Sequence, residues 1–98
     1  MHNLDLEERY QNFIKTSIKE ILPDAKIFIY GSRVKNKALK YSDVDIAVKC
    51  PTKISFEKIL KLKAYFEDST FPYQVDLIDL DNISEKFLSM IKEDLTEI

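Results

Sequence analysis

The sequence predicts an α+β fold with a three-stranded mixed β-sheet and helices packed on one side. Three segments carry apolar residues at three- and four-residue steps, which is the spacing of amphipathic helices. Three shorter segments are rich in β-branched and aromatic residues or alternate polar with apolar residues, as strands do. Their order along the chain is helix, strand, strand, helix, strand, helix, which is typical of a small α+β domain.

The first half of the chain is expected to hold one helix and two strands. An apolar stripe predicts an amphipathic helix over residues 5–22, stopped by Pro23. The run KIFIY at residues 26–30 predicts a strand that ends at Gly31. Residues 43–50 alternate strictly and predict a half-buried strand, with one apolar face made of Val44, Ile46, Val48 and Cys50.

The second half is expected to hold a helix, a strand and a last helix. Ser55 predicts the N-cap of a helix through about Asp68. Its inward residues are expected to be Phe56, Ile59, Leu60, Leu62 and Phe66. YQVDLIDL at residues 73–80 predicts the third strand. Asn82, with Glu85 three residues on, resembles a capping box and predicts the start of the last helix. That helix carries a core stripe of Ile83, Phe87, Ile91 and Leu95.

Composition excludes several classes of protein. The 98 residues predict one domain over residues 1–98, and the mixed signs of its charges argue against disorder. No apolar run approaches the ~18–20 residues of a membrane span, and the acidic start lacks the layout of a signal peptide. One cysteine, Cys50, allows no internal disulfide, so we expect a cytoplasmic protein. The net charge of −2 argues against general nucleic-acid binding, so a nucleotide would need a local site.

Three aspartates are predicted to meet at one end of the sheet. Asp43 and Asp45 lie two residues apart on a strand, so their carboxylates point to one face. The helix that joins this strand to the third makes the two strands parallel, which brings Asp76 level with the pair. Asp79 lies an odd number of residues after Asp76 on the same strand, so its side chain points to the opposite face of the sheet. We expect Asp79 to have a structural role. If the first strand is antiparallel to the second, Gly31 reaches the same end.

This cluster predicts a site for a cation and a phosphate. Neighbouring carboxylates repel one another, and a hard divalent cation such as Mg²⁺ relieves the repulsion. Gly31 is the only glycine in the chain, which indicates a backbone position that needs a positive φ or a close approach. Backbone amides near Gly31 and Ser32 can meet a phosphate at the start of a short helical turn. The arrangement suits metal-assisted transfer at phosphorus.

The segment GSRVKNKALKYSDVDIAV, with VDLIDL downstream, resembles the minimal nucleotidyltransferases of the DNA polymerase β-like superfamily. It contains Gly31-Ser32, ten intervening residues and then Asp43-Val44-Asp45. The resemblance covers essentially the whole chain and implies the nucleotidyltransferase fold. Members of this family are usually encoded beside a helical HEPN-domain partner. One departure is Asn36, where family members often have glycine.

The resemblance implies a magnesium-dependent nucleotidyltransferase, an enzyme that transfers AMP from ATP to a hydroxyl acceptor. It assigns Asp43 and Asp45 to metal and triphosphate binding. It assigns Asp76 to the second of two Mg²⁺ ions and to deprotonation of the acceptor hydroxyl. Gly31 and Ser32 would grip the terminal phosphates of the nucleotide.

The residues after this glycine are basic. Arg33 is a candidate phosphate ligand, because its planar fork suits a phosphate or the carboxylate of a partner. Lys35, Lys37 and Lys40 are expected to be solvated.

The acceptor is expected on another chain, because larger relatives add an acceptor-gripping domain for which 98 residues leave no room. The resemblance implies a tyrosine of a HEPN toxin, silenced by AMP, and hence the antitoxin of a toxin–antitoxin pair. Two alternatives stay open: a non-catalytic module that neutralises the HEPN partner by complex formation, and nucleotidyl transfer to a small molecule. An exposed sheet edge leaves both homo-oligomers and hetero-oligomers open.

Overall fold

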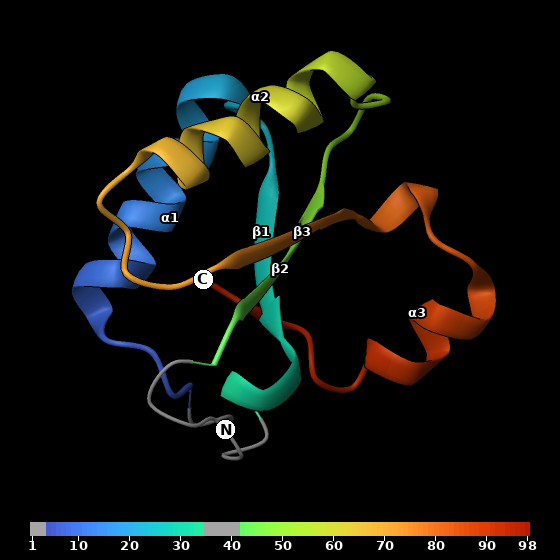
Figure 1. Cartoon of the computed structure of the whole chain (residues 1–98). Helices are drawn as coiled ribbons and strands as arrows, with labels where there is room; N and C mark the ends of the chain where they lie inside the picture. The colour runs from blue at the N-terminus through green and yellow to red at the C-terminus, as the bar shows by residue number, and fades with distance from the viewer. Residues whose placement is uncertain (1–3, 35–41) are drawn as a thin grey trace.

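The computed structural model describes residues 4–34 and 42–98, so the predictions made for Lys35, Asn36, Lys37 and Lys40 lie outside the described residues. In these ranges the chain forms a mixed β-sheet with helices against it (Figure 1). The elements, in chain order, are α1 (Glu8–Ile21), β1 (Lys26–Tyr30), the 3₁₀ helix η1 (Gly31–Arg33), β2 (Val44–Lys49), α2 (Phe56–Asp68), β3 (Val75–Asp79), the 3₁₀ helix η2 (Leu80–Asn82), α3 (Glu85–Ile91) and β4 (Thr96–Glu97).

The sheet has the strand order β3-β2-β1-β4. β1 is antiparallel to β2 and to β4, while β2 and β3 are parallel and joined through α2. The α+β class and the mixed sheet are therefore confirmed, with one strand more than predicted. The additional strand is β4, in which Thr96 pairs with Ile29 and Glu97 pairs with Phe28.

The helices cover both faces of the sheet, so the prediction that they pack on one side is wrong for α3. α1 and α2 lie together in Figure 1 and α3 lies apart from them. The larger core cluster joins α1 and α2 to one face through residues that include Ile14, Ile18, Ile27, Ile46, Leu62 and Leu77. On the opposite face, Ile91 of α3 packs with Tyr30 and Ala47. Ala47 and Tyr30, which lie on the second face, are also buried. Both faces of these strands are therefore covered.

Side-chain caps set the starts of two helices. The Ser55 hydroxyl accepts a hydrogen bond from the Lys58 amide at 3.3 Å, which confirms the predicted N-cap of α2. The predicted cap of the last helix at Asn82 is wrong. Asn82 belongs to η2, and the Ser84 hydroxyl caps α3 by accepting from the Phe87 amide at 3.1 Å.

The inward face of α2 is narrower than predicted. Leu62 and Phe66 are buried, whereas Phe56 is 74% exposed and Leu60 is 49% exposed. Within the described part of the chain, no helix has the length and apolar character needed to cross a membrane.

Candidate functional site

Gly31, the first residue after β1, has a backbone conformation that favours glycine. Its φ is +81°, in the left-handed region that other residues rarely adopt. The amide of Val34 donates to the Gly31 carbonyl at 3.0 Å and closes the η1 turn. A Cβ added to Gly31 would overlap the Asp45 carboxylate. Both the positive φ and the close approach of Asp45 therefore account for a glycine at this position.

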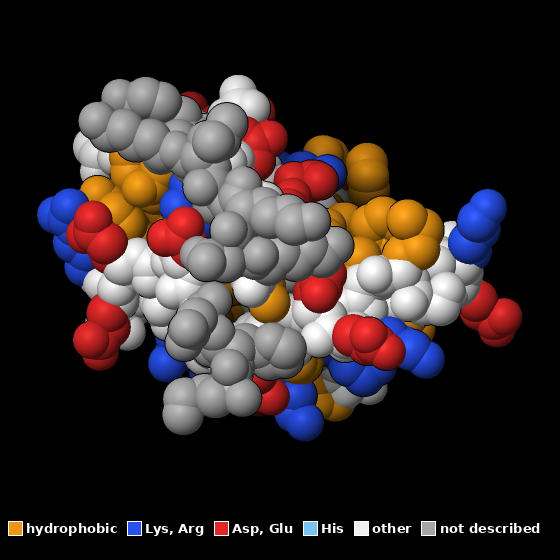
Figure 2. Space-filling view, turned by 90° about the horizontal axis from the view of Figure 1, so that it is seen from below, with side chains coloured by type: hydrophobic (Ala, Val, Ile, Leu, Met, Phe, Trp, Pro, Cys, Tyr) orange, Lys and Arg blue, Asp and Glu red, His pale blue; other side chains and the backbone are white. Residues whose placement is uncertain are grey.

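Strand register brings the predicted site residues to one end of the sheet. Asp45 pairs with Asp76 across the parallel β2–β3 ladder and with Tyr30 across the antiparallel β1–β2 ladder. Asp43 lies directly before β2 and is exposed. Figure 2 shows the molecule from below, from the end at which η1 lies in Figure 1, with several acidic side chains on this surface.

Asp45 is the electrostatic centre of this cluster. Its partial burial, together with the nearby Asp76 and Asp43 carboxylates, raises its pKa to about 6. The pKa of the Tyr30 hydroxyl is also raised, first by burial and then by the Asp45 and Asp76 carboxylates. Among residues 4–34 and 42–98, no group of three Asp, Glu, His or Cys side chains has the geometry to hold a metal ion. The site is thus a pair of register-matched aspartates with a third nearby, held in a setting that disfavours negative charge.

Arg33, two residues after Gly31, is buried in the fold. Its side chain is only 4% exposed, and its guanidinium donates to the Asp5 carbonyl at 3.1 Å and to the Ser42 carbonyl at 2.7 Å. The guanidinium carbon lies 4.3 Å from the centre of the Tyr73 ring, in a cation–π contact. The Asp5 amide donates to the Arg33 carbonyl at 2.7 Å. Arg33 therefore ties the turn after β1 to the segments before α1, β2 and β3, and its phosphate contact stays a prediction.

Asp79 lies at the other end of β3, where it pairs in register with Val48. Its carboxylate accepts from the Asp81 amide at 3.0 Å and caps η2. The structural role expected for Asp79 agrees with this contact.

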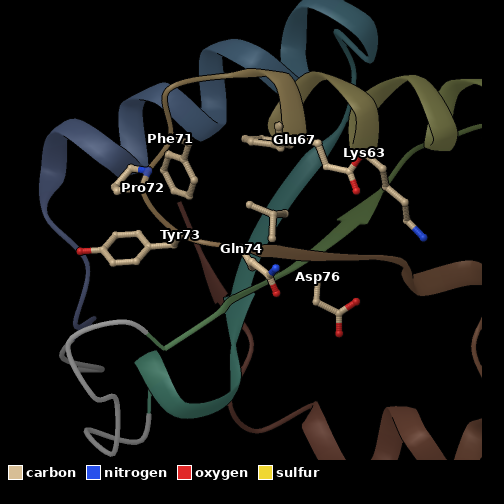
Figure 3. Close-up of a pocket in the computed structure, with 9 residues that line it drawn as sticks. Lys63, Glu67, Phe71, Pro72, Tyr73, Gln74 and Asp76 are labelled. Atoms are coloured by element: carbon tan, nitrogen blue, oxygen red, sulfur yellow. The ribbon is translucent and has the colours of Figure 1, made fainter.

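Two features of the site were not predicted from the sequence. The first is Tyr30, which pairs with Asp45 in the β1–β2 ladder. A pocket of about 460 Å³ between α2 and the start of β3 has Asp76 in its wall (Figure 3). The strand alternation ending at Tyr30 is a signal that could have found the first feature. The pocket depends on the packing of a helix against a sheet edge and leaves no sequence pattern.

Comparisons with known proteins show the family and the fold of this chain. The family model described as Polymerase beta, Nucleotidyltransferase matches residues 12–98. The probable protein adenylyltransferase MntA of Haemophilus influenzae is 37% identical over 90 residues, which are 92% of this chain and 79% of that protein.

Two solved structures share the fold. A chain in the structure of the tri-AMPylated Shewanella oneidensis HEPN toxin with its MNT antitoxin has a TM-score of 0.73 at 22% identity, over 94% of this chain and 71% of that chain. A chain in the crystal structure of a toxin–antitoxin with AMP-PNP has a TM-score of 0.76 at 23% identity, over 89% and 70%. At these identities the likeness shows the fold.

Proposed function

The chain belongs to the polymerase beta nucleotidyltransferase family, and on that premise we propose that it transfers AMP from ATP to a hydroxyl group of a partner protein. The observation that carries the proposal is the register pairing of Asp45 with Asp76 beside Gly31. The Haemophilus relative is named a protein adenylyltransferase, and one structural neighbour contains a tri-AMPylated HEPN toxin. These names support a HEPN-domain toxin as the partner and an antitoxin role for this chain. We propose a tyrosine of that toxin as the acceptor.

The nucleotide is proposed to bind with its terminal phosphates against the turn after β1. Gly31 presents backbone without a side chain at this point, so a phosphate can approach it closely. Ser32 adds a hydroxyl group and a backbone amide in the same turn. Asp45, which contacts the position that a Gly31 side chain would occupy, lies directly beside this phosphate path.

The proposed reaction is an in-line displacement at the α-phosphorus of ATP. The acceptor oxygen forms a new bond to phosphorus, the bond to the oxygen that bridges to the β-phosphate breaks, and pyrophosphate leaves. Asp76 is proposed to take the proton of the acceptor hydroxyl, because it is the exposed member of the register pair and lies on the edge strand.

The carboxylates fit Mg²⁺ as the metal of this reaction. Asp43, Asp45 and Asp76 offer hard oxygen donors. The pKa of Asp45 is raised first by burial and then by the Asp76 and Asp43 carboxylates, whose repulsion a cation would relieve. We propose two ions, with Asp76 a ligand of the second. Bound Mg²⁺ supplies charge neutralisation on the phosphate oxygens in such sites. The unpaired Cys50 thiol supports a cytoplasmic location.

The test incubates the protein with labelled ATP, Mg²⁺ and the product of the neighbouring gene, the expected HEPN-domain partner. We expect label on the partner with wild type and with the control Asp24→Ala, and none with Asp43→Ala combined with Asp45→Ala. Absence of transfer by wild type, or equal transfer by the double variant, rejects the catalytic proposal. A double variant that still neutralises the partner in cells supports the binding module, and label found only on a small molecule supports the other alternative.

A further inference from the structure

The side chain of Arg33 joins the two ends of the connection between β1 and β2. Arg33 directly follows Ser32 in the turn after β1, and its Nη2 donates to the Ser42 carbonyl at 2.7 Å. This distance is at the short end of the range for N–H···O hydrogen bonds. Figure 1 shows η1 and the start of β2 close together at the lower end of the molecule. One buried cation therefore bridges the turn after β1 and the segment that leads into β2.

The bond to Ser42 acts on the backbone of Asp43. The Ser42 carbonyl and the Asp43 amide belong to one peptide group, which is planar and rigid. A side chain that fixes this carbonyl therefore fixes the plane from which the Asp43 backbone starts. On the other side of Asp43, the Val44 amide donates to the Gln74 carbonyl at 2.9 Å. Asp43 thus lies between two anchored backbone groups.

Asp43 depends on such anchors more than the other two carboxylates of the site do. Asp45 and Asp76 lie within β2 and β3 and pair with each other in the parallel ladder. Asp43 lies outside β2, whose register pairs with β3 begin at Val44. Strand pairing therefore sets the positions of Asp45 and Asp76. The position of Asp43 relative to the turn after β1 depends instead on the bond from Arg33.

The Arg33 guanidinium is itself held by two further segments. Its Nη1 donates to the Asp5 carbonyl at 3.1 Å, and the Asp5 amide donates to the Arg33 carbonyl at 2.7 Å. Its central carbon lies 4.3 Å from the centre of the Tyr73 ring. With only 4% of Arg33 exposed, these contacts hold the guanidinium in one orientation. A supporting side chain whose own conformation is locked in this way can position a reactive group precisely.

We propose that Arg33 is a positioning residue, which fixes Asp43 relative to the turn after β1 through the Ser42 carbonyl. It acts through the backbone and contacts neither ATP nor the acceptor. This inference rests on the proposed function, because it concerns the position of a carboxylate used in AMP transfer. The competing role is that of a phosphate ligand, in which the guanidinium turns from the Ser42 carbonyl to the nucleotide. The experiments below separate the two roles.

The first experiment uses the wild-type protein and needs no transfer. The ¹⁵N resonances of the Arg33 guanidinium are recorded by NMR, without nucleotide and with ATP and Mg²⁺. We expect two separate Nη signals, because bonds to two different carbonyls stop the guanidinium from rotating. Both signals should keep their positions when ATP and Mg²⁺ are added. A single averaged signal in the free protein, or a shift as large as that of the Gly31 amide, overturns the proposal.

The second experiment follows Asp43 in a variant. Arg33→Lys keeps the charge, but a single ammonium does not reproduce the planar fork that reaches two carbonyls. We expect the ¹⁵N resonance of the Asp43 amide to shift and those of Asp45 and Asp76 to stay in place. Ile18→Ala, which removes buried side-chain volume in α1, is the control for lost stability and should leave the Asp43 resonance unchanged. An unmoved Asp43 resonance in Arg33→Lys overturns the proposal.

The third experiment separates kcat from KM in the AMP-transfer assay. In Arg33→Lys we expect kcat to fall about tenfold to a hundredfold, because a misplaced carboxylate loses the geometry of the reaction. The KM for ATP should stay close to that of wild type, since no contact with the nucleotide is removed. Ile18→Ala, assayed below its unfolding temperature, should match wild type in both constants. An unchanged kcat in Arg33→Lys overturns the proposal, and a raised KM for ATP beside it identifies a phosphate ligand.

A wild-type protein that transfers no AMP rejects the proposed function instead. The Nη signals of Arg33 and the amide resonance of Asp43 then decide the positioning role by themselves, because neither measurement needs transfer.

Discussion

The Asp45 carboxylate is held in the fold at an energetic cost, and Asp45→Asn is expected to recover that energy. Burial, with the charges of Asp76 and Asp43, raises the pKa of Asp45 from its ordinary 3.8 to about 6. A neutral amide of nearly the same shape removes both the desolvation of a charge and the repulsion between carboxylates. The variant should therefore be more stable than the wild type wherever the wild-type carboxylate is ionised.

The size and the pH range of this effect follow from the shift. About two pKa units at 1.36 kcal/mol each correspond to at most about 3 kcal/mol. The folded state binds the proton more tightly than the unfolded state, so wild-type stability falls as pH rises from about 4 to about 6. The gain from Asp45→Asn is absent below about pH 4 and is complete above about pH 6.

Urea unfolding at pH 4 and pH 8, with a chelator present to exclude divalent cations, measures this gain. Asp24→Asn is the matched control, because Asp24 is exposed in the turn before β1, and its effect should stay within about 0.5 kcal/mol. An Asp45→Asn variant that is no more stable than wild type at pH 8 would refute the reasoning. So would a gain of the same size at pH 4.

Three further predictions address the turn, the buried arginine and the metal. Gly31→Ala should lower the free energy of unfolding by about 1–3 kcal/mol, because alanine is strained at φ +81° and its Cβ displaces Asp45. The variant should also lose AMP transfer. Urea unfolding measures the first effect and the labelling assay the second, and a fully active variant would contradict the role of this turn. Arg33→Met should lower the free energy of unfolding, measured by urea without nucleotide, by about 2–3 kcal/mol, because two hydrogen bonds from a buried cation are lost. Unchanged stability with a raised KM for ATP would instead support a role in phosphate binding. The affinity for Mg²⁺, measured by calorimetry, should weaken about tenfold per pH unit below about pH 6, because protons compete with the metal for Asp45. An affinity that does not depend on pH would show that Asp45 is not a metal ligand.

The sequence was sufficient to predict the strands that carry the site. Alternation placed Asp43 and Asp45 on one face, and the crossover through α2 made β2 and β3 parallel, so the level of Asp76 followed from topology. Local periodicity and connection rules determine these features, and both can be read from a single chain.

The missed features depend on contacts that no local pattern records. β4 consists only of Thr96 and Glu97, too short for alternation to be visible, and it exists because β1 offers an edge to it. Ser84 displaced Asn82 as the helix cap because η2 uses Asn82 for its own turn. The burial of Arg33 could not be predicted either, because its carbonyl partners come from distant segments.

The parallel ladder between β2 and β3 has a consequence for how this site can evolve. Asp45 and Asp76 are kept level by backbone hydrogen bonds between their strands, which depend little on the identity of the surrounding side chains. Substitutions in the helices can therefore accumulate without altering the spacing of the two carboxylates. The surfaces around these two carboxylates can therefore change while the spacing between them stays constant, which is consistent with the same fold in solved structures that are less than 25% identical to this chain.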